Sequence, residues 1–379
     1  MNVPKLRFKE FNDEWSFAKL SEISSNISYG MGLASKEYDG TNKYIRITDI
    51  DETTNKYSNK DIVSPDGELE EKYLVNKNDI LFARTGASTG KTYLYDEKDG
   101  KLYFAGFLIR ANIINHDANF IFQQTKTNKY NKWVKIMSMR SGQPGINSQE
   151  YGSYKFSITS LKEEEKISKT LKLLDKKIEL QTKKIEDLKL FKKGLITEAK
   201  KGKSDWDEFY IKDIFKITRG IVIPKMELTD TITNENIYPV YSSQTSNEGI
   251  LGYDKKYDFD GKYLTWTTDG ANAGSVFYRN GKFRCTNVCG VLYNENNNYI
   301  NEMVAELLNL ETPKYVSYVG NPKLMNNVMA DIKIQLPNLN IQSKIATNLK
   351  LLNNKIILET KKLNKLQKLK KGLIQNMFV

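Results

Sequence analysis

Three short segments carry residue types that could do chemistry, but each fails the spacing or the residue types that the chemistry requires. Gly86-Ala87-Ser88-Thr89-Gly90-Lys91-Thr92 has the glycines and lysine of a phosphate-binding loop, yet three residues separate its glycines where that loop has four. Pro65-Asp66 lies too close to Glu70-Glu71-Lys72 for the carboxylate and lysine set of a metal-dependent nuclease. Asn321-Pro322-Lys323-Leu324 fails the Asn/Asp-Pro-Pro-aromatic loop of adenine methyltransferases at two positions. We therefore expect no catalytic residue in this chain.

Residues that usually bind metals are scarce. The one histidine, His116, excludes a two-histidine metal site, and its setting in Asn115-His116-Asp117 predicts a solvated loop. The two cysteines, Cys285 and Cys289, have no histidine near them and are more typical of buried apolar residues than of ligands. Two cysteines also cannot form a disulfide framework, which favours a reducing compartment. We expect no metal site and no cofactor in this chain.

The charge of the chain favours an anionic partner and is concentrated in two segments. Its 58 Lys and Arg against 46 Asp and Glu give a net charge of +12. Residues 161–201 carry 13 basic and 8 acidic side chains, and residues 339–379 carry 9 and 1, so these segments account for the whole excess. No stretch approaches the about 20 apolar residues of a membrane helix. We expect a cytoplasmic protein without a membrane partner.

The two charged segments are copies of each other. Residues 161–196 align with 339–374 without a gap, and 19 of the 36 positions are identical. The blocks before them match loosely, with the glycine-rich stretch 86–90 parallel to 270–274. The chain is therefore two copies of one unit. Its predicted parts are a longer domain over 1–160, a helix over 161–201, a second longer domain over 202–338 and a second helix over 339–379.

Each repeated segment has the apolar spacing of a long helix. Leucine and isoleucine recur every three or four residues without proline, which is the a/d pattern of a coiled coil. Gly194 and Gly372 predict the C-terminal ends of the helices. The predicted seam consists of Ile167, Leu171, Leu174, Ile178, Ile185 and Leu188 in the first copy and of Ile345, Leu349, Leu352, Ile356, Leu363 and Leu366 in the second.

The two helices are expected to pack against each other in antiparallel directions. A parallel pair would require the roughly ten residues at 197–206 to cross about 50 Å, because a helix rises about 1.5 Å per residue. An extended chain spans at most about 3.5 Å per residue, so the connection is too short. Antiparallel pairing also relates the two halves of the chain by a pseudo-twofold axis.

The two longer blocks have the pattern of mixed α/β domains. Short apolar runs bounded by glycine, asparagine and aspartate predict strands. The clearest runs are 44–47, 80–83, 263–266 and 331–336, and helices are expected at 119–139 and 299–310. The predicted fold is two α/β (α+β) domains, pseudo-twofold related and separated by two long antiparallel coiled-coil helices.

With this arrangement the chain resembles the specificity subunit of type I restriction–modification enzymes. The resemblance covers nearly the whole chain and rests on two divergent blocks that alternate with two similar helices. Its local signatures are Leu6-Arg7-Phe8 ahead of Trp15, and the closing Leu369-Lys370-Lys371-Gly372-Leu373-Ile374-Gln375-Asn376-Met377-Phe378. The resemblance implies that each block is a target recognition domain for one half of a bipartite double-stranded DNA site.

The resemblance also implies protein partners. The helices would set the length of the unread spacer and dock two modification subunits, which bind S-adenosylmethionine and methylate adenine N6. Restriction subunits, which use ATP and Mg²⁺, would complete the endonuclease. None of these cofactors is expected in this chain, which by itself would not be an enzyme.

Base-reading side chains are expected in glycine-rich loops of both blocks, because Arg pairs bidentately with guanine and Asn or Gln with adenine. The candidates are Arg84, Lys91, Arg140 and Gln143 in the first block and Arg219, Gln244, Asn272 and Lys323 in the second. The near-neutral charge of the blocks argues against simple DNA binding, which usually needs a basic face. Two other hypotheses stay open: a coiled-coil scaffold with two protein- or glycan-binding domains, and a self-contained nuclease or methyltransferase.

Overall fold

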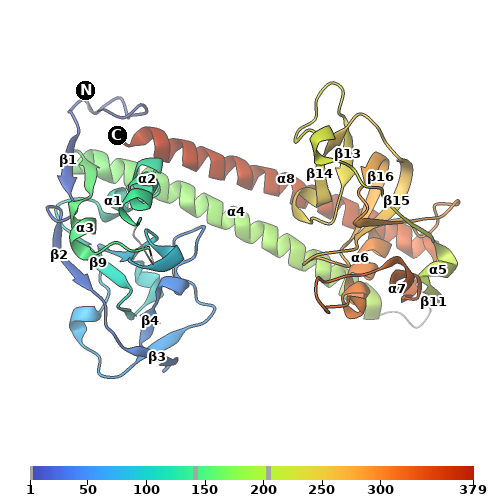
Figure 1. Cartoon of the computed structure of the whole chain (residues 1–379), viewed down its shortest axis with the longest axis horizontal. Helices are drawn as coiled ribbons and strands as arrows, with labels where there is room; N and C mark the ends of the chain where they lie inside the picture. Colours follow the sequence, from blue (N-terminus) through green and yellow to red (C-terminus); the bar gives the residue numbers. More distant parts are fainter. Residues whose placement is uncertain (1–2, 140–143, 202–205) are drawn as a thin grey trace. The chain divides into compact units, whose positions relative to one another are not determined.

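The computed structural model describes residues 3–139, 144–201 and 206–379 and divides the chain into two compact units (Figure 1). Unit 1 comprises residues 1–181 together with 362–379, and unit 2 comprises residues 182–361. Two long helices, α4 (Leu161–Lys201) and α8 (Leu339–Met377), each contribute one part to unit 1 and the other part to unit 2. Each unit therefore combines one α/β domain with parts of both helices.

Unit 1 is built on a four-stranded antiparallel sheet. Its strand order is β2 (Ser24–Tyr29), β9 (Leu108–Ile113), β6 (Asp79–Ala83) and β7 (Thr92–Leu94). Two-stranded ladders join β1 (Ser16–Lys19) to β10 (Lys155–Ile158), β3 (Ala34–Glu37) to β5 (Val63–Asp66) and β4 (Lys43–Ile45) to β8 (Leu102–Phe104). The helices are α1 (Ala118–Gln124), α2 (Asn128–Met137) and α3 (Ser148–Ser153), with 3₁₀ turns at Ile47–Asp49, Glu71–Tyr73, Gly86–Ser88 and Glu97–Asp99.

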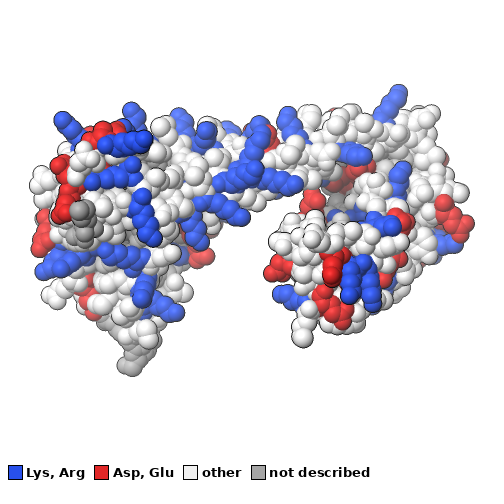
Figure 2. All heavy atoms as spheres, turned by 90° about the horizontal axis from the view of Figure 1, so that it is seen from above, with Lys and Arg blue, Asp and Glu red and all other residues white. Residues whose placement is uncertain are grey.

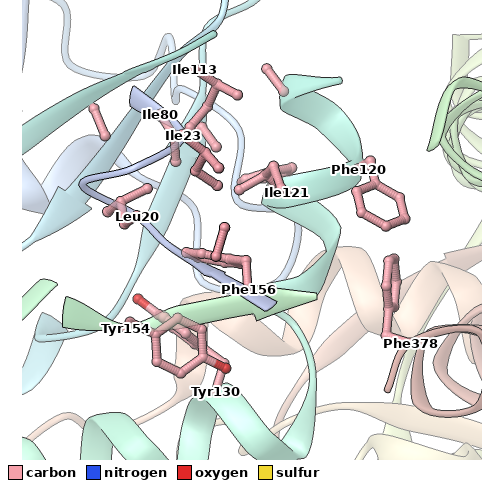
Figure 3. Close-up of a cluster of buried hydrophobic side chains, with 14 of the residues drawn as sticks. Leu20, Ile23, Ile80, Ile113, Phe120, Ile121, Tyr130, Tyr154, Phe156 and Phe378 are labelled. Carbon is pink, nitrogen blue, oxygen red and sulfur yellow. The ribbon is translucent and has the colours of Figure 1, made fainter. Parts of the chain in front are cut away.

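The single helix expected at 119–139 is in fact two helices. Thr127 begins α2 by accepting a hydrogen bond from Tyr130 N at 3.2 Å, so α1 and α2 are separate elements. The change of direction lets aromatic residues of both helices enter the core of unit 1 (Figure 3). Phe120 of α1 points toward Phe378 from the end of the chain, with 5.2 Å between the ring centroids.

Unit 2 is built on a six-stranded sheet. Its strand order is β12 (Lys216–Arg219), β17 (Cys289–Tyr293), β15 (Phe259–Thr267), β16 (Val276–Cys285), β13 (Tyr238–Tyr241) and β14 (Ile250–Asp254). A separate ladder joins β11 (Asp207–Tyr210) to β18 (Lys333–Leu336). The helices are α5 (Ile211–Ile214), α6 (Glu302–Glu311) and α7 (Asn326–Ala330), with 3₁₀ turns at Lys225–Glu227, Ser246–Gly249 and Thr312–Tyr315.

The two units share one topology. β2, β9, β6 and β7 of unit 1 correspond in order and direction to β12, β17, β15 and β16 of unit 2. The ladder of β1 with β10 likewise corresponds to that of β11 with β18. Even an isolated parallel bridge recurs, between Met31 and Ala105 in unit 1 and between Ile221 and Thr286 in unit 2. The loosely matching sequence blocks therefore form the same fold twice.

The long helices pair in antiparallel directions within unit 1. Lys370 of α8 forms an ion pair with Asp175 of α4. Ile374, which follows Lys370, packs in the same core as Ile167 and Leu171, which precede Asp175. Residue numbers therefore rise along one helix as they fall along the other.

The same direction holds within unit 2. Lys184 Nζ lies 2.9 Å from Glu359 Oε1, and Ile196 packs in the same core as Leu349. Glu359 is buried, and it interrupts the apolar seam in the sequence. The ion pair with Lys184 therefore contributes to compensating this buried charge.

None of the twelve predicted seam residues is exposed. Ile167, Leu171, Leu174, Ile185, Leu349 and Leu352 are buried, and Ile178, Leu188, Ile345, Ile356, Leu363 and Leu366 are half-buried. Ile167 and Leu171 also belong to the hydrophobic core of unit 1, and Leu349 belongs to that of unit 2. The seam therefore also attaches each domain to the helices.

The prediction that the two helices end at Gly194 and Gly372 is wrong. α4 continues past Gly194 to Lys201, and α8 continues past Gly372 to Met377. A glycine inside a helix costs about 1 kcal/mol relative to alanine. Ile196 and Ile374 follow two residues later and are almost completely buried, and burying such a side chain gains about 1.5–3 kcal/mol. Packing of the next turn therefore outweighs the glycine penalty.

Candidate nucleic-acid interface

The described candidate side chains of unit 1 lie at one end of its sheet. β2 and β6 end where β9 begins, because β9 runs antiparallel to both. Gly30 N donates to Leu108 O at 3.1 Å, and Arg84 N donates to Phe107 O at 3.0 Å. The chain leaving β2 and the chain leaving β6 therefore flank the turn before β9. We call the residues at this end, 29–31, 84–91 and 105–108, the loop end of unit 1.

A glycine allows two chain segments to cross closely at this end of each unit. A Cβ on Gly30 would lie 2.3 Å from Ala105 O, and a Cβ on Gly220 would lie 2.0 Å from Cys285 O. Neither distance can accommodate a side chain, so both positions require glycine. The residue before each glycine is the last of its strand, Tyr29 in β2 and Arg219 in β12.

Arg84 is half-buried at the loop end of unit 1. Its guanidinium lies over the ring of Tyr29, with 4.9 Å between Cζ and the ring centroid. Its Nη1 donates one long hydrogen bond of 3.4 Å to Gly106 O. The Tyr29 hydroxyl accepts a hydrogen bond from Ser148 N at 3.1 Å. This bond and the Arg84 charge lower the pKa of Tyr29 despite its partial burial, so α3 anchors the ring that orients Arg84.

The glycine-rich loop of unit 1 is joined to the segment before α3. Gly86 N donates to Pro144 O at 2.9 Å, which closes a contact across 58 residues of sequence. Lys91 Nζ lies 2.7 Å from Glu52 Oε1, so a carboxylate already neutralises this candidate. The other two candidates of this domain, Arg140 and Gln143, lie outside the described residues.

The loop end of unit 2, which we define as residues 219–221, 268–274, 286–289 and 317–323, is built in the same way. Gly220 N donates to Cys289 O and Thr268 N donates to Val288 O, both at 3.1 Å, so β12 and β15 end on either side of one turn. The glycine-rich stretch after β15 is again tied to a distant segment, because Gly270 N donates to Pro322 O at 2.9 Å.

Three candidates are exposed at the loop end of unit 2. Arg219 ends β12, and Asn272 lies in the glycine-rich stretch after β15. The third, Lys323, is bridged through its backbone to Asp269, and its Nζ lies 3.9 Å from Asp269 Oδ1. The structure therefore brings basic, amide and acidic groups together at this end.

Gln244, the fourth candidate of unit 2, is committed to its own loop. Its amide donates to Ile250 O, and the side chain is half-buried. The same loop covers Arg279, whose Nη2 donates to Glu248 O at 2.7 Å. The Arg279 guanidinium also stacks on Tyr241, with 3.6 Å between Cζ and the ring centroid. These contacts give the Gln244 amide and the Arg279 guanidinium structural roles.

Apolar side chains at the loop ends were missed by sequence reasoning. Phe107 of unit 1 is 58% exposed, and Tyr318 and Val319 of unit 2 are 69% and 93% exposed. Exposed apolar groups can contact the thymine methyl in the major groove. A usable signal was present in the sequence, because Tyr29 and Arg219 each precede a glycine at corresponding positions of the two blocks.

The histidine contacts a buried carboxylate, and both cysteines are buried in the protein. His116 is not a solvated loop residue, because its Nδ1 lies 2.9 Å from Oε1 of the buried Glu164. Cys285 and Cys289 are buried, unpaired and 3.3 Å apart. Within the described ranges no group of three His, Cys, Asp or Glu side chains could hold a metal ion, and no helix is long and apolar enough to span a membrane.

Lysine and arginine are spread unevenly over the surface. Figure 2 shows blue side chains along the long helices, and a mixture of blue and red over the domains. Many domain charges are neutralised locally, as in the Arg284 ion pairs with Asp254 and Asp258. The near-neutral domains therefore do not present a uniformly basic face, and DNA contact at the loop ends would rest on a few side chains.

A second candidate surface lies on the long helices. Leu173 and Leu351 occupy corresponding positions of the repeat and are 61% and 65% exposed, and Leu180 and Leu358 are both 58% exposed. A third corresponding pair, Phe191 and Leu369, is 60% and 52% exposed. Spacings of 7 and 11 residues place the three positions on one helix face, since 18 residues make five turns. We call the first two positions of each copy an apolar stripe: Leu173 and Leu180 of α4 in unit 1, and Leu351 and Leu358 of α8 in unit 2.

The stripe of unit 1 borders an open groove. The groove has a volume of about 350 Å³ and is lined by Leu173 together with Asp117, Ser168, Lys169 and Lys172. Exposed leucine beside charged residues is typical of a surface that another protein covers. The repetition of the stripe predicts two equivalent docking positions.

Comparison with known proteins shows that one family model matches both halves of the chain. The family model of the type I restriction modification DNA specificity domain matches residues 12–190 and 203–368. The N-terminal portion of a candidate type I specificity subunit of Mycoplasma pneumoniae is 48% identical over 140 residues, which is 37% of this chain and 73% of that relative. The specificity subunit of the type I restriction enzyme MpnII from the same organism is 46% identical over 142 residues, 37% of this chain and 42% of that relative.

Solved structures show the same architecture. The crystal structure of a type I restriction–modification S subunit from M. genitalium matches with a TM-score of 0.70, covering 100% of this chain and 99% of that one at 16% identity. A chain from a structure on complex assembly of the type I restriction–modification system matches with a TM-score of 0.50 at 15% identity, covering 95% and 96%. At these identities the likeness is one of fold.

Proposed function

Because the chain belongs to the family of type I restriction modification DNA specificity domains, we propose that it is the DNA-recognition subunit of a type I restriction–modification complex. The observation that carries this proposal is the repeated loop end. Both units place the same strand ends, the same close glycine crossing and the same inter-segment hydrogen bond at one end of the sheet. A constant scaffold with different exposed side chains is suited to reading two different short sequences.

Each loop end would read one half of a bipartite double-stranded site. The loop end of unit 1 offers Arg84, Tyr29 and Phe107, whereas that of unit 2 offers Arg219 and Lys323. Guanidinium and amide groups distinguish bases by bidentate hydrogen bonds in the major groove. Because the two sets of side chains differ, the two half-sites should differ in sequence.

The helices would set the unread spacer and dock the partners. α4 has 41 residues and is therefore about 60 Å long at 1.5 Å per residue. The two apolar stripes would each dock one modification subunit, in which S-adenosylmethionine is bound and adenine N6 is methylated. Restriction subunits with ATP and Mg²⁺ would then join the complex, and this chain itself would bind no cofactor.

Methylation mapping tests this function. The chain would be co-expressed with the modification subunit of its own genome in a host without adenine methylation, and the host DNA sequenced for N6-methyladenine. We expect one new split motif with two short half-sites and a fixed gap. Expression of the modification subunit alone is the control and should leave the DNA unmodified. Unmodified DNA despite a purified complex of the two proteins would refute the proposal.

The same experiment separates the alternatives. A coiled-coil scaffold for proteins or glycans should neither form this complex nor retain duplex DNA. A self-contained methyltransferase should methylate DNA without the modification subunit, and a self-contained nuclease should cleave it with Mg²⁺ alone.

A further inference from the structure

The described arginines fall into two groups: those held by carboxylates or by aromatic rings in a buried site, and the others, which have no carboxylate partner and which we call unengaged. Seven of the eight arginines lie in the described part of the chain. Four of them lie within 4.0 Å of a carboxylate oxygen: Arg7 with Glu163, Arg46 with Asp49, Arg110 with Asp79, and Arg284 with Asp254 and Asp258. Arg279 is buried and stacked on aromatic rings. Arg84 and Arg219 remain, and in the described ranges no carboxylate pairs with either.

Both unengaged arginines lie at loop ends. Arg84 follows β6 in unit 1, and Arg219 ends β12 in unit 2. A guanidinium kept free of carboxylates retains its donors for an outside acceptor. Four of the other five described arginines are held by carboxylates, and Arg279 is held by aromatic rings and by Glu248 O.

Arg84 is held in a way that leaves its donors available. Of its five N–H groups, one makes the long 3.4 Å bond to Gly106 O, the single hydrogen bond of this side chain within the described ranges. The guanidinium lies over the Tyr29 ring, with 4.9 Å between Cζ and the ring centroid, and a ring contact of this kind occupies none of the N–H hydrogen-bond donors. The ring is fixed in turn by Ser148 N at 3.1 Å. The side chain is therefore pre-oriented with its edge unpaired.

Guanine is the base whose acceptors suit this arrangement. Its O6 and N7 atoms are two acceptors in one plane, and they fit the planar fork of arginine. A phosphate also accepts two hydrogen bonds from a guanidinium, and the salt dependence of DNA binding distinguishes the two ligands. We propose, on the basis of the function proposed above, that Arg84 reads a guanine in the half-site of unit 1 and that Tyr29 is its positioning residue.

Four variants of the assembled complex test the proposal by methylation mapping. Arg84→Ala should relax one guanine position of one half-site, with discrimination reduced about ten- to a hundredfold, while the other half stays unchanged. Arg84→Lys should relax the same position, because a point charge cannot replace the fork. Tyr29→Leu should relax it partially, and Tyr29→Phe, which keeps the ring, should behave as wild type. Arg46→Ala, in which a carboxylate-paired arginine is lost, is the control and should keep the motif.

Binding of duplex DNA distinguishes base reading from a phosphate contact. Loss of a phosphate contact weakens binding to all sequences and lowers the slope of log K against log salt by about 1. Arg84→Ala should instead leave that slope unchanged and weaken binding to the cognate site. Thermal unfolding of each variant checks that the fold is retained.

Several outcomes would overturn the assignment. These are an unchanged motif in Arg84→Ala, a full rescue by Arg84→Lys, a relaxed position that is not guanine, or a motif altered equally by Arg46→Ala. A wild-type motif without a G·C pair would do the same. If the wild-type complex methylates no split motif, the proposed function itself fails and the assignment fails with it.

Discussion

Buried glutamates in the first turn of α4 attach the N-terminal segment to unit 1. Glu163 and Glu164 are both completely buried. Glu163 accepts hydrogen bonds from Arg7 Nε at 2.8 Å, from Thr159 Oγ1 at 2.7 Å and from Trp15 Nε1 at 3.2 Å. Burial raises the pKa of Glu163, but the bonds from Arg7 and Thr159 outweigh burial and hold the pKa below its ordinary value. The stabilising effect of such a buried charge depends on the hydrogen-bond donors around it.

Glu163→Gln is expected to lower the free energy of unfolding by about 2–4 kcal/mol, because Arg7 loses its charged acceptor. Glu165→Gln is the matched control with an expected loss below about 0.5 kcal/mol, since Glu165 lies in the same helical turn but is exposed. Urea unfolding measures both. The contribution of Glu163 is present above the unfolded pKa of about 4.3 and is lost as the pH falls through the lower folded value, so its effect should vanish in acid. Equal losses in both variants would contradict this.

Lys126 is a second strongly perturbed charge of unit 1. Its Nζ lies 4.2 Å from the centroid of the Phe122 ring. Burial, and secondly the charge of Lys370, lower the pKa of Lys126 to about 7, although Asp175 opposes this shift. The protonated form is therefore disfavoured in the folded protein.

Stability should rise with pH between about 7 and 10. An unfolded lysine titrates near 10.4, so in this window the unfolded chain binds more protons than the folded chain, and the free energy of unfolding increases by up to about 1.4 kcal/mol per pH unit. Lys126→Met should remove this slope and raise stability at pH 7. Urea unfolding at pH 6.5, 8 and 9.5 measures it. The slope persisting in the variant would assign the effect to another group.

At the scale of elements, the crossing after the first sheet strand defines each loop end. A glycine follows each of the strands β2 and β12. Gly30 lies against the backbone of Ala105, and Gly220 lies against the backbone of Cys285. Tyr29 and Arg219 are the last residues before these two glycines, and the turn that precedes β9 or β17 lies against each glycine. The close approach of two chain segments at each glycine therefore positions the residues that would contact DNA.

Gly30→Ala and Gly220→Ala should each destabilise the chain by about 2 kcal/mol or more, because their Cβ atoms would lie 2.3 Å and 2.0 Å from carbonyl oxygens. Gly32→Ala is the control, since nothing lies within 4 Å of its Cβ position. Thermal unfolding compares the three. A shift for Gly32→Ala as large as for Gly30→Ala would show that the crossing is not the cause.

At the scale of the whole molecule, duplication of the unit duplicates both candidate surfaces. The loop ends differ in side chains, whereas the apolar stripes recur with leucine at Leu173 and Leu351 and at Leu180 and Leu358. A surface that varies between copies suits different DNA sequences, and a surface that is preserved suits two copies of one partner.

The double variant Leu173→Glu, Leu180→Glu should reduce the number of bound modification subunits from two to one. Two charges on the stripe of unit 1 prevent apolar contact there, while the stripe of unit 2 is untouched. Native mass spectrometry of the co-expressed complex counts the subunits. Leu190→Glu is the control: Leu190 is 69% exposed, but Lys368 occupies its place in the second copy. Two bound subunits in the double variant would remove the stripe from the interface.

The linear pattern of the sequence determined the repeat, the two long helices, the α/β character of the domains and the glycine-rich loops that hold most of the candidates. These are local signals, because identity and apolar spacing are read along the chain. The tertiary structure alone decided which charges are engaged. Arg7 and Glu163 meet across 156 residues of sequence, and Gly86 meets Pro144 through a hydrogen bond that spacing does not predict. The sequence alone does not show which arginines are free to bind a ligand. Ion pairing and burial decide this, and both depend on neighbours that only the folded chain brings together.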